Sequence, residues 1–278
     1  MRYFGLPIWY GSGRIDDVLQ IAYEKGFDYV EISLDYPWPE IIDEIVFNRV
    51  KKLIKEYDFK VGIHAPWRDI SLASPRENLR VASLKVYKKC ISFAEKLESE
   101  YFNFHIFTKE ATEYEEVYKA VYQATKRSIK EIVRLCNEAG VKPTLENNPT
   151  EFLGKIEEIN TILHEIGNLY MCLDIGHMIV ANTKKEELKE TSELEKWFRT
   201  LGDKVKVIHI HDYRVEGEKV RDHFLLGKGD IDIDNMVNLI NNSKAHFILL
   251  EMFWLSRNKR VSIDDLRSIL IFLRSKIS

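Results

Sequence analysis

The chain has 278 residues, 45% of them hydrophobic, and its 41 lysines and arginines against 44 acidic residues give a net charge of −3. That balance excludes a global basic field of the kind that attracts nucleic acid, but it leaves room for a local basic patch. No apolar run approaches the roughly 20 residues that a membrane span needs. We therefore expect a globular protein without a membrane partner, and the length suits one α/β barrel domain over residues 1–278.

The three cysteines, Cys90, Cys136 and Cys172, form no CxxC pair and lie within apolar patterns. Such cysteines are typical of reduced, buried thiols in a cytosolic protein. The first predicted strand begins within a few residues of Met1, which leaves no room for a signal peptide. Both observations predict a cytoplasmic location.

Apolar and amphipathic segments follow one another in strict alternation along the whole chain. Strands are predicted at residues 3–8, 29–34, 60–65, 101–107, 142–147, 169–174, 205–210 and 247–251. Helices are predicted at residues 16–25, 40–57, 74–97, 114–139, 154–166, 193–201, 233–241 and 264–276.

This alternation of eight strands with eight helices, joined by short turns, favours right-handed βαβ crossovers. It predicts the α/β class and a single (β/α)8 TIM barrel. The longest predicted loops, 66–75, 177–191 and 212–232, all follow strands. A barrel of this kind carries its chemistry in those loops, so we expect the site at the C-terminal ends of the strands.

Histidines and carboxylates gather where the predicted strands end. Brought together at one rim, such groups would repel or desolvate each other unless a cation neutralised them. The pattern therefore predicts a site for a divalent metal, with Mn, Zn, Mg and Co as candidates and no organic cofactor. The residues concerned, from the third strand to the eighth, are His64, His105, Glu146, Asp174, His177, His209, His211, Asp212, His223 and Glu251.

Aromatic side chains reinforce the same rim. Two interpretations stay open: the rings plug loops onto the barrel, or they form a pocket wall that packs against a sugar or stacks on a base. A polar floor under aromatic walls suits a polyhydroxylated ligand. Just past the strand ends lie Trp9, Trp38, Trp67 and Trp254, with Phe107 and Phe253 beside them.

Four motifs resemble the metal site of the xylose-isomerase-like barrel superfamily, which includes metal-dependent sugar isomerases and epimerases and endonuclease IV-type apurinic endonucleases. The resemblance covers essentially the whole chain, and it implies one four-ligand cation site. The matching residues are Glu146 in Thr-Leu-Glu-Asn, Asp174 in Leu-Asp-Ile-Gly-His, His209 in His-Ile-His-Asp and Glu251 in Leu-Leu-Glu-Met.

The segment that begins at His64-Ala-Pro-Trp looks like the endonuclease branch. That branch implies further metal ligands at His64, His105, His177 and His223. The chain departs from it at the loop histidine, where Arg221 stands two residues before His223 in place of Asp. The residues after His105 and Glu146 differ as well. These departures argue against a third metal and against cleavage of damaged DNA.

The resemblance and the broken loop motif lead to the prediction of a divalent-metal-dependent sugar or sugar-phosphate isomerase or epimerase. Its reaction is proton transfer next to a carbonyl, with a small sugar as the partner and the cation stabilising the enediolate. Glu146 and Glu251 are the predicted catalytic base and acid. The predicted substrate-binding residues are His64, His105, His177, Trp9, Trp67, Trp254 and Lys228.

The alternative is an endonuclease IV-like, metal-dependent apurinic endonuclease or phosphodiesterase in DNA repair, and only this alternative makes nucleic acid a partner. It requires two or three cations a few Å apart and a basic groove. A third interpretation is a non-catalytic, metal-stabilised binding barrel. The sequence leaves the oligomeric state open, a homo-oligomer included.

Overall fold

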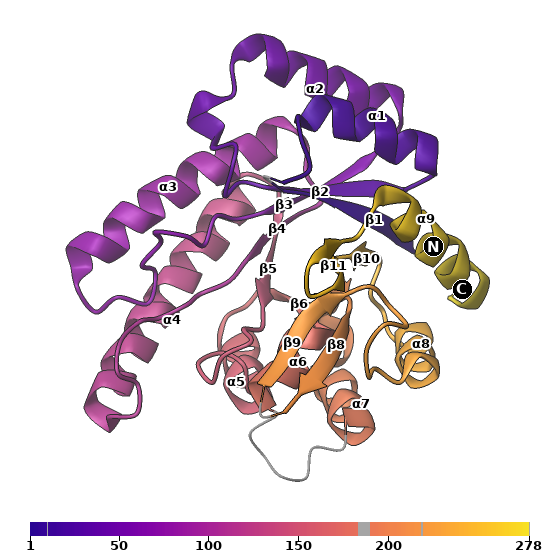
Figure 1. The fold of residues 1–278 in the computed structure, drawn as a ribbon. Coiled ribbons are helices and arrows are strands. Elements are labelled where there is room, and N and C mark those ends of the chain that lie inside the picture. Colours follow the sequence, from indigo (N-terminus) through magenta and orange to yellow (C-terminus); the bar gives the residue numbers. More distant parts are fainter. Residues whose placement is uncertain (10, 183–189, 218, 278) are drawn as a thin grey trace.

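The structure, a computed structural model, describes residues 1–9, 11–182, 190–217 and 219–277 and contains a closed barrel of parallel strands (Figure 1). The strand order around the barrel is β1-β10-β7-β6-β5-β4-β3-β2, which confirms the predicted TIM barrel. The strands are β1 (Tyr3–Ile8), β2 (Tyr29–Ser33), β3 (Lys60–His64), β4 (Tyr101–Phe104), β5 (Lys142–Glu146), β6 (Tyr170–Asp174), β7 (Val205–Ile210) and β10 (Phe247–Leu250).

Helices surround the barrel and bury their apolar faces against it (Figure 1). Their ends carry the expected signals: Asp43 caps α2 by accepting from Val46 N, and Ser262 with Asp265 forms a capping box at α9. The helices are α1 (Ile15–Lys25), α2 (Glu44–Glu56), α3 (Glu77–Lys96), α4 (Glu115–Glu138), α5 (Ile156–Glu165), α6 (Ile175–Asn182), α7 (Glu190–Leu201), α8 (Ile233–Asn242) and α9 (Ile263–Lys276), with 3-10 turns at Pro39–Ile41 and Gly202–Lys204. No helix in the described part of the chain is long and apolar enough to span a membrane.

Two of the predicted loops contain regular structure, so their prediction as irregular segments is wrong in part. Helix α6 starts directly after β6, while residues 183–189 of the predicted loop 177–191 lie outside the described residues. The predicted loop 212–232 contains the hairpin of β8 (Asp212–Glu216) and β9 (Lys219–Phe224). This hairpin forms a small second sheet with β11 (Trp254–Ser256) and β12 (Lys259–Arg260). The alternation is hidden because charged residues occupy much of β8 and β9.

The barrel interior is apolar toward the N-terminal ends of the strands, which we call its lower part, and polar toward their C-terminal ends. Tyr29, Tyr101 and Phe247 fill the lower part, and the ring of Phe247 lies 5.2 Å and 5.3 Å from the other two. Gly62 makes room for this layer, because a Cβ there would lie 2.2 Å from the Tyr101 ring. Above it the strand ends carry buried polar side chains, among them Asn103. The apolar layer is therefore the floor on which the candidate site is built.

The three cysteines are buried and free, as predicted from their apolar surroundings. Burial raises the pKa of the Cys90 thiol to about 12, and it raises the pKa of Cys172 well above the ordinary value. These groups are therefore protonated at neutral pH and behave as small apolar side chains.

Candidate metal centre

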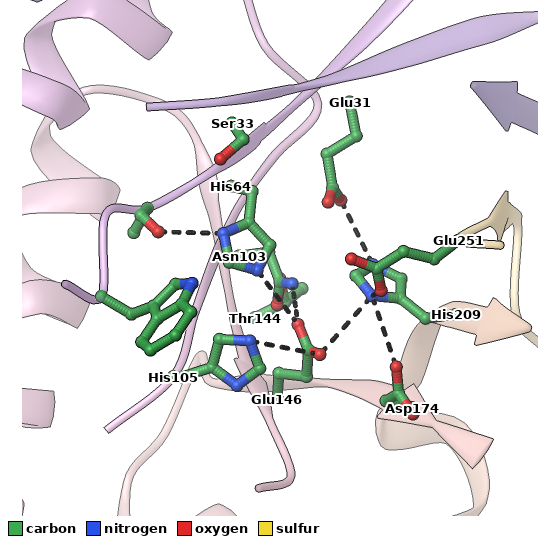
Figure 2. Close-up of polar contacts among 12 residues, drawn as sticks. Glu31, Ser33, His64, Asn103, His105, Thr144, Glu146, Asp174, His209 and Glu251 are labelled. Carbon is green, nitrogen blue, oxygen red and sulfur yellow. Dashed lines mark hydrogen bonds and ion pairs between the residues drawn. The ribbon is translucent and has the colours of Figure 1, made fainter. Parts of the chain in front are cut away.

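Four of the predicted ligands converge above the apolar floor (Figure 2). Glu146, Asp174, His209 and Glu251 each offer one ligand atom, and these atoms all lie within 4.8 Å of one another. His209 Nδ1 is 2.8 Å from a Glu251 oxygen, 3.5 Å from Glu146 and 3.9 Å from Asp174. Strands β5, β6, β7 and the end of β10 thus bring four neighbouring strand ends to one point.

A second group shares one of these carboxylates. His64, at the end of β3, and His105, just after β4, place Nε2 atoms 3.5 Å and 3.3 Å from the two oxygens of Glu146. The three residues form another cluster of ligand atoms within 4.8 Å. Asn103 donates a hydrogen bond to Glu146 and fixes its carboxylate between the two groups (Figure 2). Glu146 would therefore contribute to both groups if each held a cation.

A third group gathers His177, His211 and His223, again within 4.8 Å of one another. Asp222 is 4.0 Å from His177 Nε2, so the displaced carboxylate of the loop motif still faces the group. His223 has a φ of 57°, which is unusual for a residue with a side chain. Backbone strain of this kind is common at functional sites.

Backbone carbonyls set the orientation of three histidines. Nδ1 of His64 lies 2.9 Å from Ala65 O, Nδ1 of His177 3.1 Å from Asn147 O, and Nδ1 of His223 3.0 Å from Glu251 O. Because a carbonyl oxygen only accepts, each Nδ1 carries the hydrogen and donates it. The Nε2 atom of each ring is then the one available to a cation.

His211 is arranged differently, since both of its ring nitrogens are used within the protein. Nδ1 accepts the backbone N–H of His223 at 2.9 Å, and Nε2 donates to the two oxygens of Asp174 at 2.9 and 3.0 Å. A Cβ at Gly176 would lie 1.9 Å from its ring, so only glycine lets the imidazole lie there. His211 thus orients Asp174 and ties it to the β9 strand. Asn147 also holds Asp174: its side-chain oxygen accepts from Asp174 N at 2.9 Å, and its side-chain nitrogen donates to Asp174 O at 2.8 Å.

Glu31 and Tyr101 support the site from below, and the sequence analysis did not identify them. His209 Nε2 lies 3.3 Å from Glu31, and Tyr101 donates its hydroxyl hydrogen to the same carboxylate oxygen at 2.6 Å. The remaining atom, His209 Nδ1, therefore faces the other ligands. A carboxylate inside the apolar segment of β2 was the available signal for Glu31.

Four buried atoms of the site make no well-directed hydrogen bond, although His209 Nδ1 and Glu251 Oε2 lie 2.8 Å apart as an ion pair: His105 Nδ1, Glu146 Oε1, His209 Nδ1 and Glu251 Oε2. A buried polar atom without a partner is costly, and natural proteins hold few of them. Carboxylate oxygens and imidazole nitrogens are ligands of divalent cations such as Zn²⁺ and Mn²⁺. The donor set therefore fits a divalent metal, and coordination would satisfy these atoms.

The charges of the site compensate one another. Burial disfavours the protonated form of His64 and His177, but neighbouring carboxylates outweigh it and raise the pKa values to about 9 and about 10. Burial likewise disfavours the ionised form of Glu251, but the charge of His209 lowers its pKa to about 2. The carboxylates are thus ionised, and protonated imidazoles supply the positive charge that a bound cation would replace.

Aromatic side chains wall a cavity of about 400 Å³ over the ligands. Trp9, Trp67 and Trp254 line it with Phe107 and Phe253, whereas Trp38 is 52% exposed and is not among the described lining residues. All three histidines of the predicted substrate-binding set, His64, His105 and His177, also line the cavity.

Lys228 lies apart from the described cavity lining, on an exposed turn. The amides of Gly227 and Gly229 in that turn donate to Asp212 at 2.9 and 2.8 Å. They are therefore occupied by a carboxylate of the protein and are not available to bind a phosphate. Asp212 also accepts from Ile231 N at 3.0 Å, so its role in the structure is to hold this loop.

We predict that Glu31→Gln weakens metal binding by roughly 10- to 100-fold while the fold survives, because Glu31 orients His209 without being a ligand. Chelator competition followed by metal analysis measures the affinity. Glu100→Gln is the matched control. Glu100 directly precedes β4, forms an ion pair with Lys60 and is absent from the described metal-ligand groups. Equal affinity in Glu31→Gln and the wild type would contradict the role given to Glu31.

Comparison with known proteins agrees with this architecture. A probable endonuclease 4 from Aquifex aeolicus is 29% identical over 258 residues, covering 87% of this chain and 88% of its own length. Another, from Halothermothrix orenii, is 25% identical and covers 92% of this chain and 95% of itself. A crystal structure of a D-tagatose 3-epimerase-like protein matches with a TM-score of 0.75 at 20% identity, covering 99% of this chain and 100% of its own, and that likeness concerns the fold. The family model described as the xylose isomerase-like TIM barrel matches residues 19–275, and the chain belongs to this family.

Proposed function

We propose that this enzyme is a metal-dependent phosphoesterase that holds at least two divalent cations. The observation that carries the proposal is the position of Glu146, whose carboxylate is shared by two clusters of buried ligand atoms. One cluster adds His64 and His105, and the other adds Asp174, His209 and Glu251. Paired cations a few Å apart activate water and stabilise the leaving oxygen in the cleavage of phosphate esters.

The two extra histidines favour this reaction over isomerisation. A single cation suffices for proton transfer next to a carbonyl, and His64 and His105 would then bind substrate hydroxyls. Their Nε2 atoms instead face the oxygens of Glu146 at 3.5 and 3.3 Å. His64 donates its Nδ1 hydrogen to Ala65 O, so loss of the second proton, on Nε2, would leave a lone pair there that suits a metal ligand.

Several residues that are not ligands would orient the ligands in this proposal. Asn103 and Asn147 hold Glu146 and Asp174 in place, and Glu31 keeps Nδ1 of His209 turned toward them. The aromatic side chains form the wall of the cavity above the ligands and reduce the water around a bound substrate. The two relatives named as probable endonuclease 4, which align with most of the chain, support phosphoester chemistry.

A sugar isomerase or epimerase is the second candidate. It is favoured by the placement of Glu146 and Glu251 in one ligand group, from strands β5 and β10, which are separated by β6 and β7 in the barrel. A substrate between them would meet one carboxylate on each face and exchange a proton next to its carbonyl. Solved structures of similar fold include a D-psicose 3-epimerase, 15% identical.

Metal content and activity together test the proposal. Elemental analysis of protein purified without chelator should give at least two metals per chain, and His64→Ala should lose about one while retaining the cluster of Asp174, His209 and Glu251. The wild type should hydrolyse bis(p-nitrophenyl) phosphate, p-nitrophenyl phosphate or an abasic-site duplex. His64→Ala should hydrolyse the same substrate at least about 100-fold more slowly, since the second cation supplies part of the activation.

The opposite pattern would establish the second candidate instead. One metal per chain, unchanged in His64→Ala, together with deuterium uptake from heavy water next to the carbonyl of a ketose or phosphoketose, would rule out the phosphoesterase. Assays with Mn²⁺, Mg²⁺, Co²⁺ and Zn²⁺ in parallel prevent a wrong metal from hiding either activity.

A further inference from the structure

Arg260 lies at the wall of the cavity above the metal ligands, between two tryptophans. Its guanidinium carbon is 3.8 Å from the ring centre of Trp254 and 4.9 Å from that of Trp9. Both contacts have cation–π geometry. Arg260 lines the same cavity as Glu251 and His223, and within the described residues it forms no ion pair with a carboxylate. Its positive charge is thus held in place without being neutralised.

Other arginines near this rim differ in that respect. Arg68, which also lines the cavity, pairs with Asp35 at 2.8 Å. Arg221 and Arg257 both pair with Glu216, at 3.1 and 2.7 Å. Arg68 therefore has a carboxylate partner, and Arg221 and Arg257 share the single carboxylate of Glu216.

The position of Arg260 is fixed by the segment that also supplies Glu251. Arg260 on β12 pairs with Trp254 on β11, and Trp254 O accepts from Leu225 N at 2.8 Å. Next to it, Phe253 N donates to His223 O at 2.8 Å. These contacts fix the backbone of Arg260 relative to His223 and Glu251, and the two tryptophan rings contact its guanidinium.

We propose that Arg260 binds a second phosphate group of the substrate while the reacting phosphate ester lies at the metal centre. This inference rests on the proposed phosphoesterase function and narrows it to small substrates that carry two phosphates. The guanidinium fork matches the geometry of a phosphate, and the two indole faces restrain it without competing for its N–H donors. A cavity of about 400 Å³ suits such a molecule.

Binding of phosphonates tests the proposal without turnover, because a carbon–phosphorus bond is not a phosphate ester. Calorimetry on the metal-loaded protein compares methylphosphonate with alkane bisphosphonates whose phosphonates are separated by two, four or six carbons. We expect one bisphosphonate to bind the wild type at least about tenfold more tightly than methylphosphonate. Arg260→Gln should abolish this preference and leave the affinity for methylphosphonate unchanged. Arg257→Gln, a matched control in the same hairpin that pairs with Glu216 and does not line the described cavity, should retain it.

Competition binding with the bisphosphonate identifies the class of molecule that carries the second phosphate. Displacement of the bound bisphosphonate by 5′-phosphorylated dithymidylate but not by unphosphorylated dithymidylate would indicate a nucleotide end, and displacement by glucose 1,6-bisphosphate would indicate a sugar bisphosphate. Equal affinity for mono- and bisphosphonates, a preference that persists in Arg260→Gln, or displacement by none of these compounds would overturn the inference. If hydrolysis and the two-metal content are retained in that case, the proposed function stands and only the role of Arg260 falls.

Discussion

Glu146→Gln is expected to reduce metal content to less than half and to slow phosphoester hydrolysis at least about 100-fold. Glu146 is the one carboxylate that the two clusters share, so its charge contributes to both cation positions. Substitutions of residues that merely support a ligand already cost roughly 10- to 100-fold in affinity, and loss of a shared ligand should cost more. The measurements are metal analysis after gel filtration and initial rates at saturating metal.

The control for this prediction is Glu138→Gln. Glu138 lies on the exposed side of α4 and pairs with Arg134 four residues before it, so its loss should change stability by no more than about 0.5 kcal/mol. Its metal content and rate should match the wild type. Full metal content in Glu146→Gln, with the same rate as this control, would refute the shared-ligand assignment.

A large loss of stability is expected from Gly62→Ala. The added Cβ would lie 2.2 Å from the Tyr101 ring, inside the closed barrel where the surrounding strands leave no direction in which to yield. Overpacking of this kind costs about 1–3 kcal/mol and sometimes more. Thermal unfolding should show a melting temperature lower by several degrees.

Gly167→Ala provides the comparison, since nothing lies within 4 Å of a Cβ at that position. Its melting temperature should remain close to that of the wild type. Because Tyr101 also donates to Glu31, Gly62→Ala should weaken metal binding as well. An unchanged melting temperature for Gly62→Ala would mean that the tyrosine layer is free to move.

The sequence predicted the barrel and a gathering of histidines and carboxylates at its rim because both depend on strand ends, whereas the choice of four ligands among these residues came from the resemblance to the superfamily. Buried strands are apolar along their length, so a histidine or carboxylate at the end is conspicuous, and parallel strands bring their ends to one rim. His64, Glu146 and Glu251 were all visible in this way. Helix α6 and the β8–β9 hairpin were missed because neither has a clear apolar period.

The supporting residues could not be predicted by the same reasoning. Glu31 and His209 are 178 positions apart in the chain, and Tyr101 is 70 positions from Glu31. Contacts of this kind depend on the register of strands across the barrel, which the sequence pattern does not specify. For Arg260, the distinguishing property is the lack of a carboxylate partner among the described residues, and this appears only when the neighbours of each arginine are known.

The polar contacts under the metal centre run from strand to strand around and across the barrel. Glu31 on β2 reaches His209 on β7, Asn103 on β4 reaches Glu146 on β5, and Asn147 joins the end of β5 to Asp174 on β6. Detachment of β2, β4, β5, β6 or β7 would therefore disturb a candidate ligand. A cation bound at this site would therefore stabilise the barrel as a unit. Its binding free energy would add to the free energy of cooperative unfolding, and amide hydrogens in the inner strands should then exchange only through global opening.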